Sequence, residues 1–84
     1  MKKITIYTGP NCPYCTAANN LLTQREVPYT EIPLGRDEHE KRSELFKRSG
    51  MKTVPQIFSD DTLIGGFSDL EKLDQVDKLE SLKS

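Results

Sequence analysis

Two cysteines separated by two residues are the most reactive feature of this sequence. The motif Cys12-Pro13-Tyr14-Cys15 follows a β-branched segment and opens a segment with apolar residues at helical spacing. This placement predicts Cys12 near a helix N-cap, with Pro13 at the first helical position. The free N–H groups and partial positive charge of a helix N-terminus favour a thiolate over a thiol. We therefore expect Cys12 to be the nucleophile and Cys15, one turn further on, the resolving thiol.

Two inert roles for the same cysteines are weaker interpretations. A disulfide that closes so short a loop adds little stability, because loop-closure entropy grows with loop length. A structural zinc ion needs four ligands. Beyond the cysteine pair the chain offers only His39 as a further soft ligand, so we expect no metal site within one chain. A cluster shared between two chains stays open.

Composition limits the class of protein. The 84 residues suffice for one domain, residues 1–84, and the formal net charge of -1 argues against a nucleic-acid partner. No apolar stretch approaches the ~20 residues of a membrane span, and none resembles a signal peptide. We expect a monomer in the reducing cytoplasm, where a paired cysteine is more often catalytic than structural.

The elements that must position the cysteines alternate along the chain. Periodicity and breaker residues predict strands at 4–8, 29–32, 55–59 and 62–64, and helices at 13–25, 37–49 and from 68 to about 76. The order β-α-β-α-β-β-α, with a turn at Asp60-Asp61, predicts an α/β fold. We expect a mixed four-stranded sheet with helices on both faces.

Two helix starts have the spacing of a capping box. These are Asp37 with Glu40 and Ser68 with Glu71. An apolar stripe is expected on the last helix, formed by Leu70, Leu73 and Val76.

A second motif, Thr53-Val54-Pro55, precedes the third predicted strand. Its ordinary interpretation is a proline that introduces a strand. The alternative is a cis Val54–Pro55 bond beside the cysteines, which would expose the Val54 backbone to pair with an extended substrate. Only ~5–6% of such bonds are cis in folded proteins.

Three motifs in register resemble the glutaredoxins. They are Cys12-Pro13-Tyr14-Cys15, Thr53-Val54-Pro55-Gln56-Ile57-Phe58 and Gly65-Gly66-Phe67-Ser68-Asp69-Leu70. The resemblance covers nearly the whole chain. It implies a thioredoxin-like fold with a cis Pro55, and it implies glutathione as co-substrate with no tightly bound cofactor.

The resemblance also implies a set of glutathione-binding residues. The Val54 backbone would pair with the cysteine moiety, the start of the last helix would hold the γ-glutamyl end, and Arg42 would reach the glycyl carboxylate. The competing interpretations are a helix-capping charge for Asp69 and a solvated charge for Arg42. The full set is Tyr14, Arg42, Thr53, Val54, Pro55, Gly66, Phe67, Ser68 and Asp69.

One position departs from the family pattern. Many dithiol glutaredoxins carry Lys three residues before the first cysteine, where this chain has Gly9. That cation would help to hold the glycyl carboxylate and to depress the pKa of Cys12. We therefore expect weaker glutathione binding or a less depressed Cys12 pKa here, unless Lys52 or Lys3 substitutes for it.

These observations predict a glutathione-dependent thiol–disulfide oxidoreductase that reduces protein disulfides and protein–glutathione mixed disulfides. Two alternatives stay open. The chain could be a hydrogen donor for ribonucleotide reductase that is itself reduced by a flavoprotein reductase. It could also be an iron–sulfur cluster carrier that uses glutathione as extra ligands.

Overall fold

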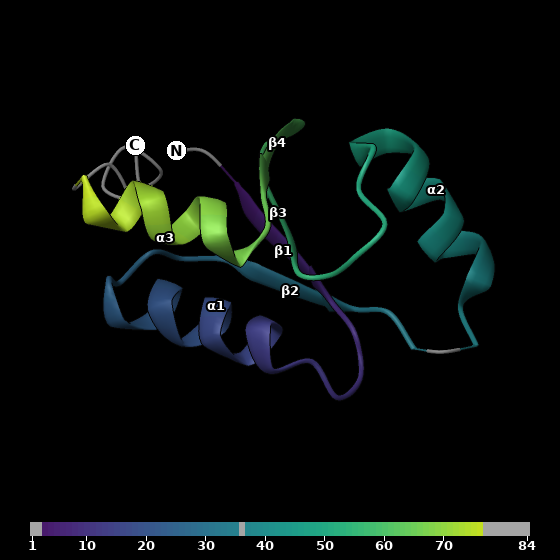
Figure 1. The fold of residues 1–84 in the computed structure, drawn as a ribbon, viewed down its shortest axis with the longest axis horizontal. Coiled ribbons are helices and arrows are strands. Elements are labelled where there is room, and N and C mark those ends of the chain that lie inside the picture. Colours follow the sequence, from purple (N-terminus) through teal and green to yellow (C-terminus); the bar gives the residue numbers. More distant parts are fainter. Residues whose placement is uncertain (1–2, 36, 77–84) are drawn as a thin grey trace.

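The computed structural model describes residues 3–35 and 37–76. Four strands and three helices alternate as the sequence predicts (Figure 1). Their bounds are β1 Ile4–Thr8, α1 Pro13–Gln24, β2 Thr30–Pro33, α2 His39–Ser49, β3 Gln56–Ser59, β4 Thr62–Gly65 and α3 Phe67–Gln75. No helix in these ranges is long and apolar enough to cross a membrane.

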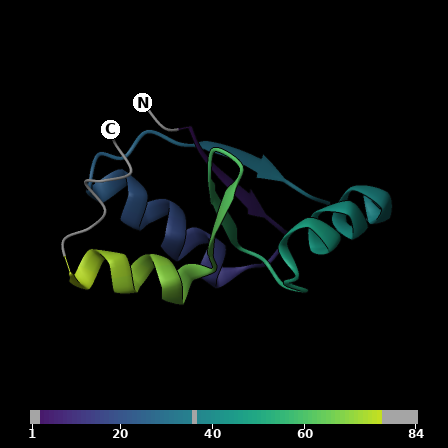
Figure 2. The ribbon, with the colours of Figure 1, turned by 90° about the horizontal axis from the view of Figure 1, so that it is seen from above.

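The strands form one mixed sheet in the order β2-β1-β3-β4. β1 and β2 run parallel, and α1 makes the crossover between them. β3 is antiparallel to both β1 and β4, and the β3–β4 hairpin turns at Asp60 and Asp61 (Figure 2). The predicted fold class is confirmed, and the turn between β1 and α1 carries the first cysteine.

The sheet separates two cores of unequal size. α1 and α3 pack side by side on the face with the larger core, whereas α2 packs on the smaller core (Figure 1). Alternation along β3 divides Ile57 and Phe58 between the two cores. The buried residues of the larger core are Ile4, Ile6, Ala18, Leu22, Val27, Ile57 and Leu70. Those of the smaller core are Leu34, Leu45 and Phe58.

The start of α2 differs from the prediction. The helix begins at His39, its N-cap is Glu38, and no side chain caps it, so the expected Asp37–Glu40 capping box is wrong. The residues before the helix form a turn in which the Glu38 N–H donates to the Gly35 carbonyl oxygen at 3.1 Å. Because of that turn, the helix begins at His39 and not at residue 37.

The start of α3 also differs. The N-cap is Gly66, and Ser68 lies inside the helix, so the predicted Ser68–Glu71 capping box is wrong. Instead Asp69 Oδ2 accepts a hydrogen bond from the Gly66 N–H at 3.0 Å. Val76 lies just past the helix end and is 60% exposed, so it does not extend the apolar stripe. The predicted tail beyond Val76 lies outside the described residues.

Candidate active site

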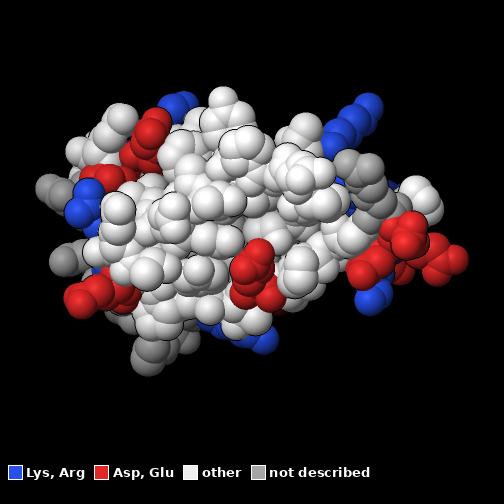
Figure 3. Space-filling model, turned by 90° about the horizontal axis from the view of Figure 1, so that it is seen from below, with Lys and Arg blue, Asp and Glu red and all other residues white. Residues whose placement is uncertain are grey.

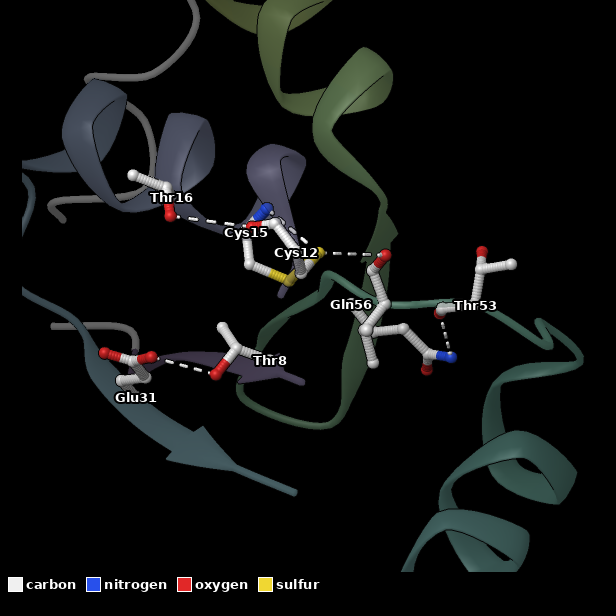
Figure 4. The surroundings of a disulfide bond; sticks show 8 residues. Thr8, Cys12, Cys15, Thr16, Glu31, Thr53 and Gln56 are labelled. Carbon is white, nitrogen blue, oxygen red and sulfur yellow. Dashed lines mark hydrogen bonds between the residues drawn. A yellow bond between two sulfur atoms is a disulfide. The ribbon is translucent and has the colours of Figure 1, made fainter. Parts of the chain in front are cut away.

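The two cysteines lie where the sequence places them. Cys12 is the N-cap of α1 with an extended backbone, and Pro13 follows it inside the helix. The Cys15 N–H donates to Cys12 Sγ at 3.2 Å, and the two sulfurs form a disulfide across Cα atoms 5.2 Å apart (Figure 4). Cys15 is only 4% exposed, whereas Cys12 is half-buried. Of the two sulfurs, that of Cys12 is the more accessible to an external thiol or disulfide.

The loop before β3 runs beside Cys12. The Val54–Pro55 peptide bond is cis, as the family resemblance implies. The Val54 carbonyl oxygen lies 3.7 Å from Cys12 Sγ (Figure 4). Peptide backbone and the accessible sulfur are therefore presented together, although they are 42 residues apart in sequence.

A buried glutamine braces this loop. Gln56 is fully buried at the first position of β3, and its Nε2 donates to the Thr53 carbonyl oxygen at 2.8 Å (Figure 4). Its Oε1 is buried with no hydrogen-bond partner in the described part of the chain. The sequence motif includes Gln56 but does not identify this role. A polar residue between Pro55 and the apolar Ile57 is the one signal that could have suggested it.

A pocket of about 250 Å³ opens next to Val54, and we call it the Val54 pocket. It brings together every predicted glutathione-binding residue except Arg42, and it adds Met51, which the sequence did not indicate. Neither cysteine lines it, but the Val54 contact places the Cys12 sulfur at its edge. The lining residues are Tyr14, Met51, Thr53, Val54, Pro55, Gly66, Phe67, Ser68 and Asp69.

Two aromatic rings from different helices flank this pocket. The Tyr14 and Phe67 ring centroids are 6.0 Å apart with a tilt of 34° between their planes. Tyr14 remains 66% exposed, so most of its ring surface is open to a bound molecule or to solvent.

The carboxylate of Asp69 is fixed by the backbone beneath it. One oxygen accepts the Gly66 N–H, so the capping interpretation is correct for that oxygen. Gly65 has φ +131°, and a Cβ at this position would collide with the Asp69 carboxylate. Glycine at 65 therefore lets Asp69 lie across the start of α3, where the helix N–H groups and a carboxylate are available to a ligand with both charges.

Arg42 lies apart from the Val54 pocket. It lines a separate groove of about 620 Å³ together with Lys47 and Lys52, and its guanidinium carbon is 5.9 Å from the centroid of the Phe46 ring. We call this the basic groove. Lys52 and Thr53 are adjacent in sequence, so the groove and the pocket meet along that loop.

A second pocket, of about 500 Å³, lies against both cysteines, and we call it the Glu31 pocket. Thr8 Oγ1 donates to Glu31 Oε2 at 2.8 Å beside the disulfide (Figure 4). This site could not be predicted from the sequence, because no motif links the cysteine segment to Thr8 or Glu31. The lining residues are Thr8, Gly9, Asn11, Cys12, Pro13, Cys15, Thr16, Asn19 and Glu31.

This side of the molecule carries few cations. Residues 4–24 contain no charged side chain at all. Viewed from the side of α1, Lys and Arg lie at the margins of the surface and not across its centre (Figure 3). In the described ranges no group of three or more His, Cys, Asp or Glu residues is arranged to hold a metal ion.

The glutaredoxin family model matches residues 4–64 of this chain. The chain belongs to the glutaredoxin family. It is 47% identical over 74 residues to glutaredoxin 3 of Escherichia coli K12, with 88% of each chain covered. It is 42% identical over 82 residues to a glutaredoxin of Neisseria meningitidis, covering 98% of this chain and 96% of the relative.

Solved glutaredoxins share the fold. The solution structure from Brucella melitensis superimposes with a TM-score of 0.85 at 41% identity, covering 99% of this chain and 89% of that one. A buckwheat glutaredoxin–glutathione complex superimposes with a TM-score of 0.87 at 23% identity, covering 98% of this chain and 76% of that one. This glutaredoxin is therefore a thiol–disulfide oxidoreductase with a thioredoxin-like fold, and Cys12 and Cys15 form its cysteine pair.

Proposed function

We propose that this glutaredoxin uses glutathione to reduce protein disulfides and protein–glutathione mixed disulfides. Cys12 is the nucleophile and Cys15 the resolving thiol. The Val54 pocket holds the glutathione part of the substrate.

The observation that carries this proposal is the composition of the Val54 pocket. Eight of the nine residues that line it are those expected to bind glutathione, and the Val54 carbonyl oxygen lies 3.7 Å from Cys12 Sγ. An exposed backbone suits a peptide substrate, since an extended peptide pairs through its own amide groups. The buckwheat protein with the same fold is a glutathione complex, which supports the same ligand here.

Each end of glutathione has a complementary site. The γ-glutamyl end carries a carboxylate and an ammonium, which suit the N–H groups that open α3 and the free oxygen of Asp69. The glycyl carboxylate would extend past Thr53 toward the basic groove, where Arg42, Lys47 and Lys52 are the available cations. Arg42 thus acts at a distance from the pocket itself.

One cysteine suffices for a mixed disulfide. The Cys12 thiolate attacks the glutathione sulfur, and the protein thiolate leaves and takes up a proton. A second glutathione thiolate then attacks the glutathione sulfur on Cys12, which releases glutathione disulfide and regenerates the Cys12 thiolate.

Two cysteines are needed for a protein disulfide. Cys12 attacks one sulfur, and the Cys15 thiolate then attacks Cys12 Sγ, so that the reduced partner leaves and the Cys12–Cys15 bridge forms. Two glutathione molecules reduce the bridge and are oxidised to glutathione disulfide.

A coupled turnover assay tests the proposal. It measures reduction of a small glutathione mixed disulfide by glutathione and glutathione reductase for the wild type, Cys15→Ser and Cys12→Ser. We expect turnover in the wild type and Cys15→Ser, and none in Cys12→Ser. A protein disulfide as substrate should be reduced by the wild type only.

The turnover assay and an absorbance spectrum together distinguish the two alternative functions. A folded wild type without glutathione-dependent turnover would favour a donor for ribonucleotide reductase that a flavoprotein reductase supplies. Visible absorbance after anaerobic purification would favour a cluster carrier. The cytoplasmic setting and the monomeric state stay predictions.

A further inference from the structure

We propose that Glu31 accepts the proton that Cys15 must lose before it attacks Cys12, through water held in the Glu31 pocket. The inference deepens the two-cysteine route. It rests on thiol–disulfide exchange between the two cysteines and not on glutathione as the reductant.

The Cys15 thiolate has fewer stabilising interactions than the Cys12 thiolate. The Cys15 N–H at the start of α1 points to Cys12 Sγ, at 3.2 Å, so the helix terminus stabilises charge on Cys12. The Cys15 side chain is 4% exposed, and burial disfavours the charged thiolate relative to the thiol. Because only the thiolate attacks a disulfide, Cys15 needs a nearby proton acceptor.

Among the described residues, Glu31 is the only charged side chain that lines the pocket shared by both cysteines. Thr8 is 3% exposed, and its hydroxyl donates to Glu31 Oε2 at 2.8 Å, which orients the carboxylate. In Figure 4 the Cys15 sulfur lies on the side of the bridge toward Thr8 and Glu31. The Cys12 sulfur instead lies 3.7 Å from the Val54 carbonyl oxygen. The other glutamate oxygen makes no hydrogen bond to any described residue and can face the pocket.

The other carboxylate near the site is committed elsewhere. Asp69 lines the Val54 pocket, and its Oδ2 accepts the Gly66 N–H at 3.0 Å. It does not line the Glu31 pocket. Glu31 is therefore the acceptor available on the Cys15 side.

The Glu31 pocket suits a water relay. Its volume of about 500 Å³ exceeds the ~30 Å³ that one water occupies in the liquid, so it has room for several. Asn19 Oδ1 is buried with no partner among the described residues, and a pocket water would supply the hydrogen bond that buried acceptors normally have. In the part of the chain that the structure describes, no Lys or Arg lines the pocket, and position 9 is glycine, so no ammonium from these residues competes for the carboxylate.

The step balances without a further reactant. With a partner bound to Cys12 through a mixed disulfide, the Cys15 S–H proton passes by way of water to the Glu31 carboxylate. The Cys15 thiolate attacks Cys12 Sγ, a bond forms between the two cysteine sulfurs, and the bond from Cys12 to the partner breaks. The partner thiolate carries away the electron pair and is protonated by the Glu31 carboxylic acid. The cysteine pair is oxidised and the partner is reduced.

A two-phase reaction isolates this proton transfer. The reduced full-length protein is mixed with one equivalent of 5,5′-dithiobis(2-nitrobenzoate), and the coloured thiolate product is followed by stopped flow. Attack by Cys12 releases the first equivalent, and resolution by Cys15 releases the second. The leaving thiolate needs no proton, so the second phase reports deprotonation and attack by Cys15. Cys15→Ser assigns the phases, because it should retain only the first.

The test variant is Glu31→Gln, whose side-chain oxygen can still accept from the Thr8 hydroxyl. We expect the second phase to slow by about tenfold or more, toward the 10²-fold that a positioned base contributes, while the first phase stays within about twofold. Glu71→Gln, at an exposed carboxylate on α3, should leave both phases unchanged.

Three outcomes would overturn the inference: a second phase slowed less than this, equal slowing of both phases, or a faster second phase. The assay contains no glutathione. Failure of the glutathione proposal would therefore leave both phases intact in the wild type, and the two failures are distinguishable.

Discussion

The side chains around Cys12 are arranged by a few local contacts. The amide of Cys15 points to its sulfur, and the Val54 carbonyl lies on its other side. The second contact depends on the loop that Gln56 braces through the Thr53 carbonyl. Geometry at the sulfur is thus set partly by a buried side chain that does not line the Val54 pocket.

Replacing Gln56 tests this brace. Gln56→Leu removes the bond to Thr53 but also removes a buried oxygen without a partner, so the stability change should stay within about 1 kcal/mol. The loosened loop should raise KM for a glutathione mixed disulfide by about threefold to tenfold, equivalent to ~0.6–1.4 kcal/mol. Steady-state kinetics and thermal melts measure both effects. The exposed Gln24→Leu is the control, and an unchanged KM in Gln56→Leu would show that the brace has no functional role.

At position 9, the effect of side-chain size can be measured separately from the effect of side-chain charge. A Cβ at this position would lie 3.1 Å from Val54 Cγ2, so any side chain crowds the loop that carries Val54. Gly9→Ala measures that crowding alone, and Gly9→Lys adds the cation found in many relatives. Relative to the alanine variant, the lysine variant should lower KM for glutathione substrates by about twofold to fivefold, as for an exposed charge pair of ~0.4–1 kcal/mol. Equal KM values for the two variants would reject a role for charge at this position.

At the scale of elements, the β4–α3 junction forms one wall of the Val54 pocket. Gly66 caps α3, and Asp69 returns to the Gly66 N–H in place of the predicted serine cap. The N-cap of the helix comes directly after Gly65, whose φ of +131° a residue with a side chain would adopt only with strain. Sequence rules for serine caps do not detect a start of this kind.

Gly65→Ala should therefore damage both the junction and the ligand site. The new methyl group would collide with the Asp69 carboxylate at a backbone φ of +131°, which predicts a loss of about 1–3 kcal/mol in unfolding free energy. KM for glutathione substrates should rise as Asp69 is displaced. Gly50→Ala is the matched control, since Gly50 has φ +73° but no atom within 4 Å of the added Cβ.

Chemical denaturation gives the first effect and turnover kinetics give the second. Gly50→Ala should lose stability without a change in KM. If the two alanine variants gave the same KM, the position of Asp69 would not matter for binding.

The sequence predicts elements and motif residues better than their junctions. The periodicity of residues 13–25 and the Asp60-Asp61 turn both led to correct elements, because each depends on local backbone preference. The resemblance implied nine glutathione-binding residues, and eight of them line one pocket. The Glu31 pocket could not be predicted, since it exists only once β1, α1 and β2 are packed together.

At the scale of the whole molecule, the two cores contribute unequally to stability, because they bury different numbers of side chains. α1 buries Cys15, Ala18 and Leu22, whereas α2 buries only Leu45. α2 carries Arg42 and Lys47 of the basic groove and leads directly into the loop of residues 50–55, which includes Val54. The helix that would meet the glycyl end of glutathione is thus held by the smaller core.

Hydrogen exchange on the native protein should reveal this difference. Elements with few buried apolar contacts open at lower free energy than the global unfolding reaction. We expect the most protected amides of α2 to exchange with an opening free energy at least about 1 kcal/mol below those of α1. The measurement is residue-resolved exchange by NMR on the oxidised protein.

Two core variants sharpen the comparison. Leu45→Ala truncates the one fully buried side chain of α2, so it should lower protection in α2 while α1 keeps most of its own. Leu22→Ala, in the larger core, should cost about 2–5 kcal/mol and lower the protection of both helices together, because it weakens the global fold. If α2 exchanged only through global unfolding, with Leu45→Ala affecting both helices equally, the sheet and its two faces would form one cooperative unit.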